Sequence, residues 1–190
     1  LKGEGMIDVA NDGSISWKGG IRSGRAKGYK TTAYSWTKNL SASYTGIKGL
    51  NIGGSYTINN APIDKDNTVS VSLIEMHASY NANNITSVFE YGMLGLSHLE
   101  LDNIDAKGYY FQSGYNVASL MDWDSCKIVP WFGMGMYDLD DASSAGEVNT
   151  IQLGLTWWPI DNIAWKIDYT MDKKDNVKTN SLNLGIGYMF

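Results

Sequence analysis

Hydrophobic and polar residues alternate with a period of two along most of this chain. The clearest stretch is 181–190, where the odd positions are small or polar until Met189 and the even positions are Leu182, Leu184, Ile186, Tyr188 and Phe190. Such alternation is typical of β-strands with one apolar and one polar face. Comparable stretches cover 50–59, 107–119, 149–158 and 162–172, with weaker ones at 34–45, 74–81, 85–94 and 128–138. The pattern predicts an all-β chain of about nine strands.

One strand changes the parity of its alternation. The run 68–73 places its apolar residues on the opposite parity from 74–81. A β-bulge adds one extra residue to a strand, which would keep the apolar residues of both segments on the same face of the sheet. The sequence therefore predicts a bulge near Ile74.

The predicted connections alternate in length. Tight turns are expected at 46–49, 81–84 and 159–162, with a slightly longer turn at 120–126, whereas longer charged segments cover 59–68, 95–106, 138–148 and 172–180. Short turns at one end and long polar loops at the other are typical of an antiparallel transmembrane β-barrel. We therefore expect residues 1–190 to form one such barrel domain.

Composition agrees with a membrane barrel. No run approaches the eighteen or so apolar residues of a membrane helix, which excludes helical spanning. The mean hydropathy of −0.25 fits a barrel as well as a soluble protein, because half of each spanning strand faces water.

Aromatic residues gather near the predicted strand ends. Tyr44, Trp157, Trp158 and Tyr188 fall near the short-turn end, as an aromatic girdle at a membrane interface requires. Tyr188 and Phe190, with the apolar residues before them, resemble the terminal signal by which the barrel assembly machinery recognises bacterial outer-membrane barrels. We expect the bacterial outer membrane as location, with outer-membrane lipid and lipopolysaccharide as neighbours.

Near the end of the chain a strand is followed by "WWP", a second strand and a terminal Phe. Together with the segments 75–92, 108–117, 128–138, 151–169 and 181–190, this arrangement resembles the C-terminal half of the phosphate-selective porin family. The resemblance implies a homotrimer of barrels with about sixteen strands each. This chain would then be the C-terminal portion, which we favour; alternatively, 13–23 supplies a tenth strand to a small barrel.

Basic residues are concentrated in one segment. Residues 13–63 contain no acidic residue, and the Gly-rich stretch 13–30 is expected to be an extracellular loop. The loop would carry Lys18, Arg22, Arg25, Lys27 and Lys30. Folded into the bore, these cations would form an anion-attracting constriction; a solvated loop near lipopolysaccharide phosphates is an equally good interpretation.

The residues expected to line the bore are of mixed charge. They are Glu75, His77, Glu90, Lys166 and Asp168. A phosphate site needs a ladder of basic side chains, so phosphate specificity is not carried over from the resemblance. The acids Glu75, Glu90 and Asp168 would instead hold the basic loop by ion pairing.

Catalysis has little support in the sequence. The two histidines, His77 and His98, show no zinc-site spacing, and there is no nucleophile or phosphate-loop motif. His98 with Ser97, Glu100 and Asp102 could imitate the surface triad of an outer-membrane hydrolase, but loop polarity explains them better. Acidic groups near the predicted loops could bind divalent cations, but a solvated acidic surface explains them better. These residues are Asp102, Asp105, Asp138, Asp140 and Asp141. We expect no enzyme, no cofactor, no metal and no nucleic-acid partner.

The sequence therefore favours a porin. It would allow passive diffusion of small hydrophilic solutes or ions, with an anion preference if the basic loop enters the bore. The first alternative is a non-conducting structural or adhesive outer-membrane barrel. The second is a soluble β-sandwich binding module.

Overall fold

The computed structural model describes residues 1–9, 13–24, 35–62, 68–98, 104–139, 146–175 and 177–189. They form eleven strands and one short 3₁₀ helix. The elements are β1 (Lys2–Val9), β2 (Gly13–Gly24), β3 (Ser35–Ile47), β4 (Leu50–Pro62), β5 (Thr68–Ala82), β6 (Ile85–His98), β7 (Ile104–Tyr115), η1 (Val117–Met121), β8 (Lys127–Asp138), β9 (Val148–Ile160), β10 (Ile163–Lys174) and β11 (Val177–Tyr188).

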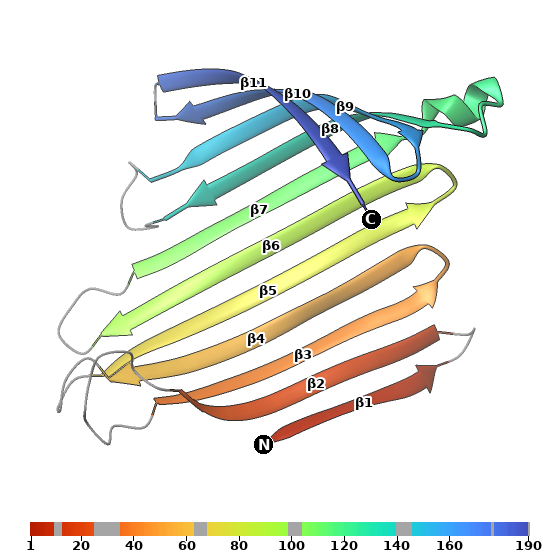
Figure 1. Cartoon of the computed structure of the whole chain (residues 1–190). Helices are drawn as coiled ribbons and strands as arrows, with labels where there is room; N and C mark the ends of the chain where they lie inside the picture. The colour runs from red at the N-terminus through yellow and green to blue at the C-terminus, as the bar shows by residue number, and fades with distance from the viewer. Residues whose placement is uncertain are drawn as a thin grey trace.

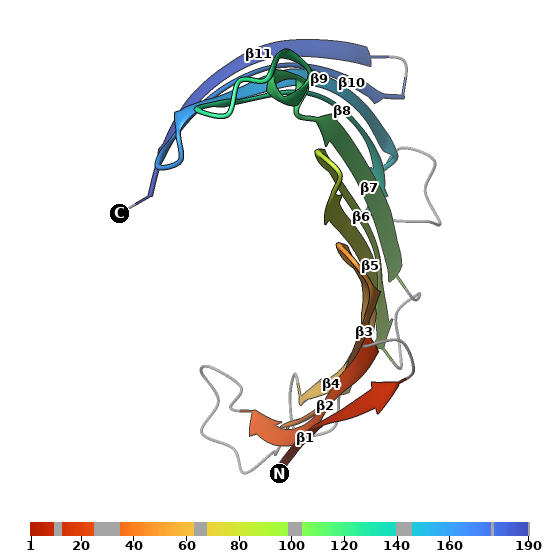
Figure 2. The same ribbon diagram turned by 90° about the vertical axis from the view of Figure 1, so that its right-hand side faces the viewer.

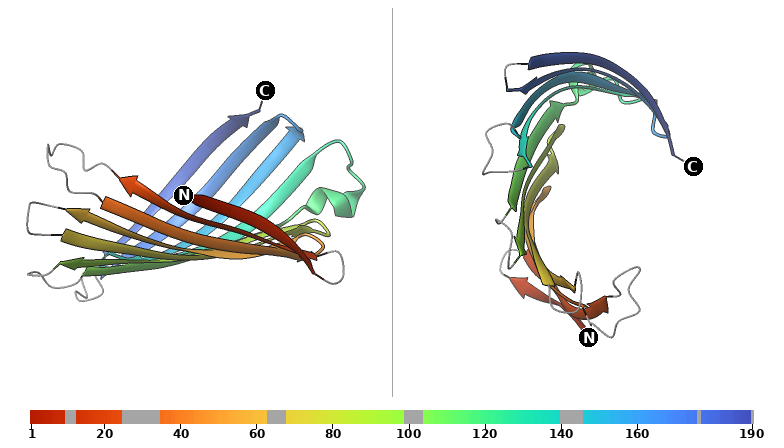
Figure 3. Two further views of the ribbon diagram at one scale, coloured as in Figure 1. Left: turned by 90° about the horizontal axis from the view of Figure 1, so that it is seen from below. Right: turned by 90° about the vertical axis from the view of Figure 1, so that its left-hand side faces the viewer.

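The strands form one antiparallel sheet in sequence order, from β1 at one edge to β11 at the other (Figure 1). The sheet curls into an open arc, and in the described residues β1 and β11 do not pair with each other (Figures 2 and 3). The prediction of an all-β antiparallel sheet is confirmed, with more strands than the nine or ten expected. A β-sandwich needs two facing sheets, so the sandwich alternative is wrong for this single described sheet.

The register between neighbouring strands gives the sheet one apolar and one polar face. Leu155 of β9 pairs with Ile167 of β10, which pairs with Leu184 of β11. One residue away, Gly154, Asp168 and Asn183 form a polar row on the other face. The apolar row is open to the surroundings, with Leu155 39 %, Ile167 43 % and Leu184 77 % exposed.

The polar face is the inner one. Along β9 the apolar residues are exposed and the polar residues between them are half-buried. Side chains on the inside of a curved sheet converge and shield one another, which explains the lower exposure of the polar set. A soluble protein would bury the apolar set instead, whereas a barrel in lipid exposes it.

Three predicted tight turns are confirmed. The turns occupy 48–49, 83–84 and 161–162. Asn83 and Asn84 both have positive φ, at 53° and 63°, as a two-residue hairpin turn requires. Gly49 (φ 81°) takes the same left-handed region. The segment at 120–126 includes the end of η1 and the connection to β8.

The predicted loops are shorter than expected because the strands extend into them. The long loop at 172–180 is wrong: Lys174 pairs with Val177, so β10 and β11 form a hairpin with a tight connection. The loop at 13–30 is wrong over Gly13–Gly24, which is β2 and is the strand named as an alternative; residues 25–30 lie outside the described residues. The bulge predicted near Ile74 is also wrong, because β5 pairs with β4 and β6 without a register shift.

Candidate functional site

The inner, polar face carries the candidate functional residues. The register places all five predicted bore residues on this face, in two groups: Glu75, His77 and Glu90 on β5 and β6, and Lys166 and Asp168 on β10. Each group is held by hydrogen bonds within the sheet.

The first group is centred on the Glu75 carboxylate. Ser55 Oγ donates to Glu75 Oε2 at 3.1 Å, and His77 Nδ1 lies 2.6 Å from Glu75 Oε1. The His77 side chain lies over Gly53 of β4, whose missing side chain leaves room for the imidazole ring. These contacts fix the orientation of a half-buried carboxylate, which otherwise would rotate freely.

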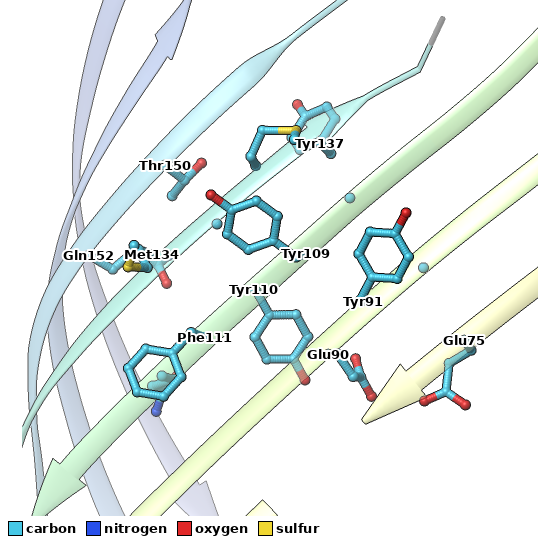
Figure 4. A pocket seen from close by; sticks show the side chains of 15 residues that line it. Glu75, Glu90, Tyr91, Tyr109, Tyr110, Phe111, Met134, Tyr137, Thr150 and Gln152 are labelled. Carbon is cyan, nitrogen blue, oxygen red and sulfur yellow. The ribbon is translucent and has the colours of Figure 1, made fainter. Parts of the chain in front are cut away.

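Glu90 and Tyr110 extend this group along the wall. Glu90 is the cross-strand partner of both His77 and Tyr110. The Tyr110 hydroxyl donates a hydrogen bond to the Glu90 carboxylate and points toward it in Figure 4, with Glu75 beyond. Two carboxylates and a phenol thus line up across three strands.

A cavity of about 550 Å³ adjoins these residues. Its floor includes Gly92, Gly108 and Gly135, and its sides include Tyr110 and Tyr137. Gly108 pairs with Tyr137, and Gly135 pairs with Tyr110, so each ring stands opposite a residue without a side chain. We call this cavity the glycine groove.

The second group is centred on Asp168, whose side chain is 8 % exposed. Asn183 Nδ2 donates to Asp168 Oδ2 at 2.8 Å, and Lys166 Nζ lies 3.5 Å from Asp168 Oδ1. Thr170 Oγ1 also donates to Oδ2 at 3.4 Å. A buried carboxylate is tolerated when it is paired and hydrogen-bonded, as Asp168 is.

Trp131 joins the second group to β8. Lys166 Nζ lies 4.5 Å from the centre of the Trp131 ring, within cation–π range. The indole lies over Gly154 and is 5 % exposed. Lys166 is itself 48 % exposed, so its charge still faces the lumen.

The basic residues of the predicted constriction are only partly described. Lys18 and Arg22 lie on β2, on the polar face, where Lys18 pairs with Glu4 and Ser41. They belong to the sheet and not to a loop. Arg25, Lys27 and Lys30 lie outside the described residues.

Two residues of the predicted girdle lie on the apolar face, and the girdle itself stays a prediction. Tyr44 pairs with Ile52, and Trp157 with Trp165, on the apolar face. Trp158 is less exposed than Trp157 and adjoins the register shift between β9 and β10. Tyr188 is 64 % exposed on β11, and Phe190 lies outside the described residues.

The sequence analysis missed Tyr110, Tyr137 and the glycines of the groove. Tyr110 falls on the polar parity of the 107–119 alternation, next to Tyr109 on the apolar parity. That position was the available signal, because an aromatic residue on the polar parity of a barrel strand faces the lumen.

No metal site or hydrolase triad is found in the described part of the chain. The described residues contain no group of three His, Cys, Asp or Glu that could hold a metal ion. Glu100, Asp102, Asp140 and Asp141 lie outside them, so the triad around His98 and most of the acidic groups are not described. No described helix has the length and apolar character needed to cross a membrane.

Comparisons with known proteins bear on the fold. No protein-family model matches the chain, and no curated protein matches it either. Among solved structures, it is similar to a loop L8 deletion mutant of OmpT, an outer membrane protein of Vibrio cholerae, with a TM-score of 0.60 and 14 % sequence identity. The match covers 98 % of this chain and 62 % of that chain.

These comparisons correct one prediction and support another. The assignment to the phosphate-selective porin family is wrong, since no family model supports it and the structural match is to OmpT. At 14 % identity the likeness establishes the fold alone. The chain has the fold of an outer-membrane β-barrel protein, and this fold supports the outer-membrane location predicted from the sequence.

Proposed function

We propose that this chain forms the wall of a passive outer-membrane pore for small hydrophilic solutes or ions. The observation that carries the proposal is the inverted sheet, with an exposed apolar outer face and an inner face that carries acidic and basic side chains. Glu75, Glu90, Lys166 and Asp168 all lie on the inner face. Ionised groups at this depth in a membrane are expensive unless they border water, which a lumen supplies.

The edges of the sheet bear on how such a pore is built. β1 and β11 each have one neighbour in the sheet. Inside a bilayer every backbone N–H and C=O needs a partner, so a spanning sheet has no open edge. The pore therefore requires that the outer edges of β1 and β11 find backbone partners in the assembled protein, either in each other or in other strands.

Conductance in planar bilayers tests the proposal. Protein extracted from outer membranes, folded as judged by faster migration on a gel when unboiled, should produce stepwise, ohmic current increases in KCl. The boiled sample provides the control. Folded protein that inserts without carrying current would contradict the pore and favour the non-conducting structural barrel.

A further inference from the structure

The glycine groove is an open recess in the inner wall. A Cβ atom built on Gly92 meets no described atom within 4 Å, so the space above this residue is unfilled. Gly92 pairs with Glu75 on one side and Gly108 on the other. A row without side chains therefore begins directly beside a carboxylate.

Two exposed aromatic rings flank this recess. Tyr110 is 44 % and Tyr137 is 47 % exposed, although both lie on the polar face. Elsewhere in the described sheet the exposed aromatic residues are concentrated on the apolar face, where lipid covers them. Rings that face a lumen offer their π faces to whatever occupies the groove.

The charge of the groove is one-sided. Glu75 and Glu90 both line it, and its described lining contains no Lys or Arg. Lys166, the lysine of the second group, is paired with Asp168 and lies over the Trp131 ring. Glu75 is hydrogen-bonded to Ser55 and His77, and Glu90 to Tyr110, but no described Lys or Arg of the lining neutralises them. A cation is therefore attracted to the groove and an anion is repelled from it.

An apolar rim lies beside the groove toward the long-loop end. Leu73 pairs with Leu94, and Leu94 with Ala106, on the same face as Glu75. Leu73 lies there because β5 has no bulge, so the parity change at Ile74 puts this leucine on the inner wall. The groove thus joins carboxylates, aromatic rings and an aliphatic edge.

We propose that the glycine groove binds small organic ammonium cations. The charged head would lie against the face of the Tyr110 ring and beside the Glu90 carboxylate, and the hydrocarbon body would cover the glycine floor toward Tyr137. Carboxylates combined with aromatic faces are the usual recognition chemistry for quaternary ammonium groups. The proposal rests on the pore function for access of the solute to the groove.

Calorimetric titration with choline tests the proposal on the full folded protein in detergent. We expect saturable binding at low salt, and much weaker binding of 3,3-dimethylbutan-1-ol, which replaces the ammonium nitrogen by carbon. Glu90→Gln and Tyr110→Leu should each weaken choline binding by about two- to fivefold, the size of one exposed ion pair or cation–π contact. Glu4→Gln makes the same change on β1, at another position of the inner face, and should leave choline binding unchanged.

A variant that fills the groove separates shape from charge. Gly92→Leu adds a side chain where there is room and should lower choline affinity by about tenfold or more. Gly185→Leu is the matched control, because its Cβ would also have room, with Lys166 Cβ as nearest atom at 3.9 Å. Absent choline binding, equal binding of the neutral alcohol, or binding insensitive to Gly92→Leu would each overturn the proposal. Conductance in KCl, recorded separately, reports whether the pore itself has failed.

Discussion

A charge placed on the outer face of β11 should destabilise the protein, and the same charge one residue away should not. Leu182 lies on the apolar face, where it pairs with Tyr169 and is 64 % exposed. Ser181 is its neighbour on the polar face, pairs with Thr170, and is also exposed. Leu182→Lys and Ser181→Lys therefore differ only in the face that receives the ammonium group.

The expected loss of stability in Leu182→Lys follows from the depth of Leu182 in the membrane. With ~3.3 Å per residue and a strand tilt of ~45°, its partner Tyr169 lies about 14 Å above Ile163 at the start of β10. This depth is near the middle of an apolar band ~25 Å tall, where Lys costs about 2–4 kcal/mol. Leu182→Lys should lower the folding equilibrium constant by roughly 30- to 1,000-fold. Ser181→Lys should change the free energy of unfolding by less than about 0.5 kcal/mol.

Equilibrium denaturation in lipid vesicles measures both variants. The fraction folded is followed by migration of unboiled samples on a gel and by tryptophan fluorescence, across a guanidinium series. A loss of stability for Leu182→Lys with little change for Ser181→Lys is the expected result. If the two variants lose the same stability, the assignment of the apolar face to lipid is wrong.

Three further outcomes are expected. Gly154→Ala should lower the free energy of unfolding by about 1–3 kcal/mol in the same assay, because its Cβ would collide with the Trp131 indole, whereas Gly185→Ala should leave it unchanged. Asp168→Asn should lower the free energy of unfolding by about 1–3 kcal/mol, because Lys166 loses its carboxylate partner. Adding Lys166→Met should recover part of this loss. Strictly additive effects of the two substitutions would contradict the pairing. Deletion of Phe190 should reduce the yield of assembled protein in outer membranes far more than the stability of the assembled fraction, and an unchanged yield would count against an assembly signal.

The strands best predicted from the sequence are those that carry their own apolar residues. β9, β10 and β11 alternate throughout, and the structure keeps that alternation. β1 was missed because its outer positions include Gly3 and Gly5, which the Trp17 side chain of β2 covers. Part of the apolar surface of this strand comes from its neighbour, and the alternation within a single strand does not reveal that.

The prediction of a bulge in β5 is wrong because this strand is longer than the apolar band of the membrane. β5 has fifteen residues, which rise about 35 Å at a ~45° tilt, more than a band ~25 Å tall. Beyond the band the outer face need not be apolar, so Ser70 and Ser72 can share the face of Ile74 without a bulge. The predicted bulge would have kept Leu73 on the face of Ile74, so its position on the inner wall was missed. The trimeric state, the lack of enzymatic activity and the choice of solute stay predictions.

A basic pair and an acidic pair on the inner wall lie on separate strands. Lys18 and Arg22 are on β2, whereas Glu75 and Glu90 are on β5 and β6. The acid opposite Lys18, Glu4, is already paired with Lys2 at 2.7 Å. With ~4.8 Å between strands, the basic and acidic groups are about 14 Å apart along the wall, which exceeds the screening length of ~8 Å at physiological salt. Each group therefore attracts its own counterions.

This separation predicts opposite changes in ion selectivity. Lys18→Gln with Arg22→Gln should move the reversal potential in a KCl gradient toward cation preference, because two positive charges on β2 are removed from the wall. Glu75→Gln with Glu90→Gln should move it toward anion preference. Both shifts should increase at lower salt, where the screening length is greater. If both double variants move the reversal potential in the same direction, or neither moves it at low salt, these side chains do not border the conducting path.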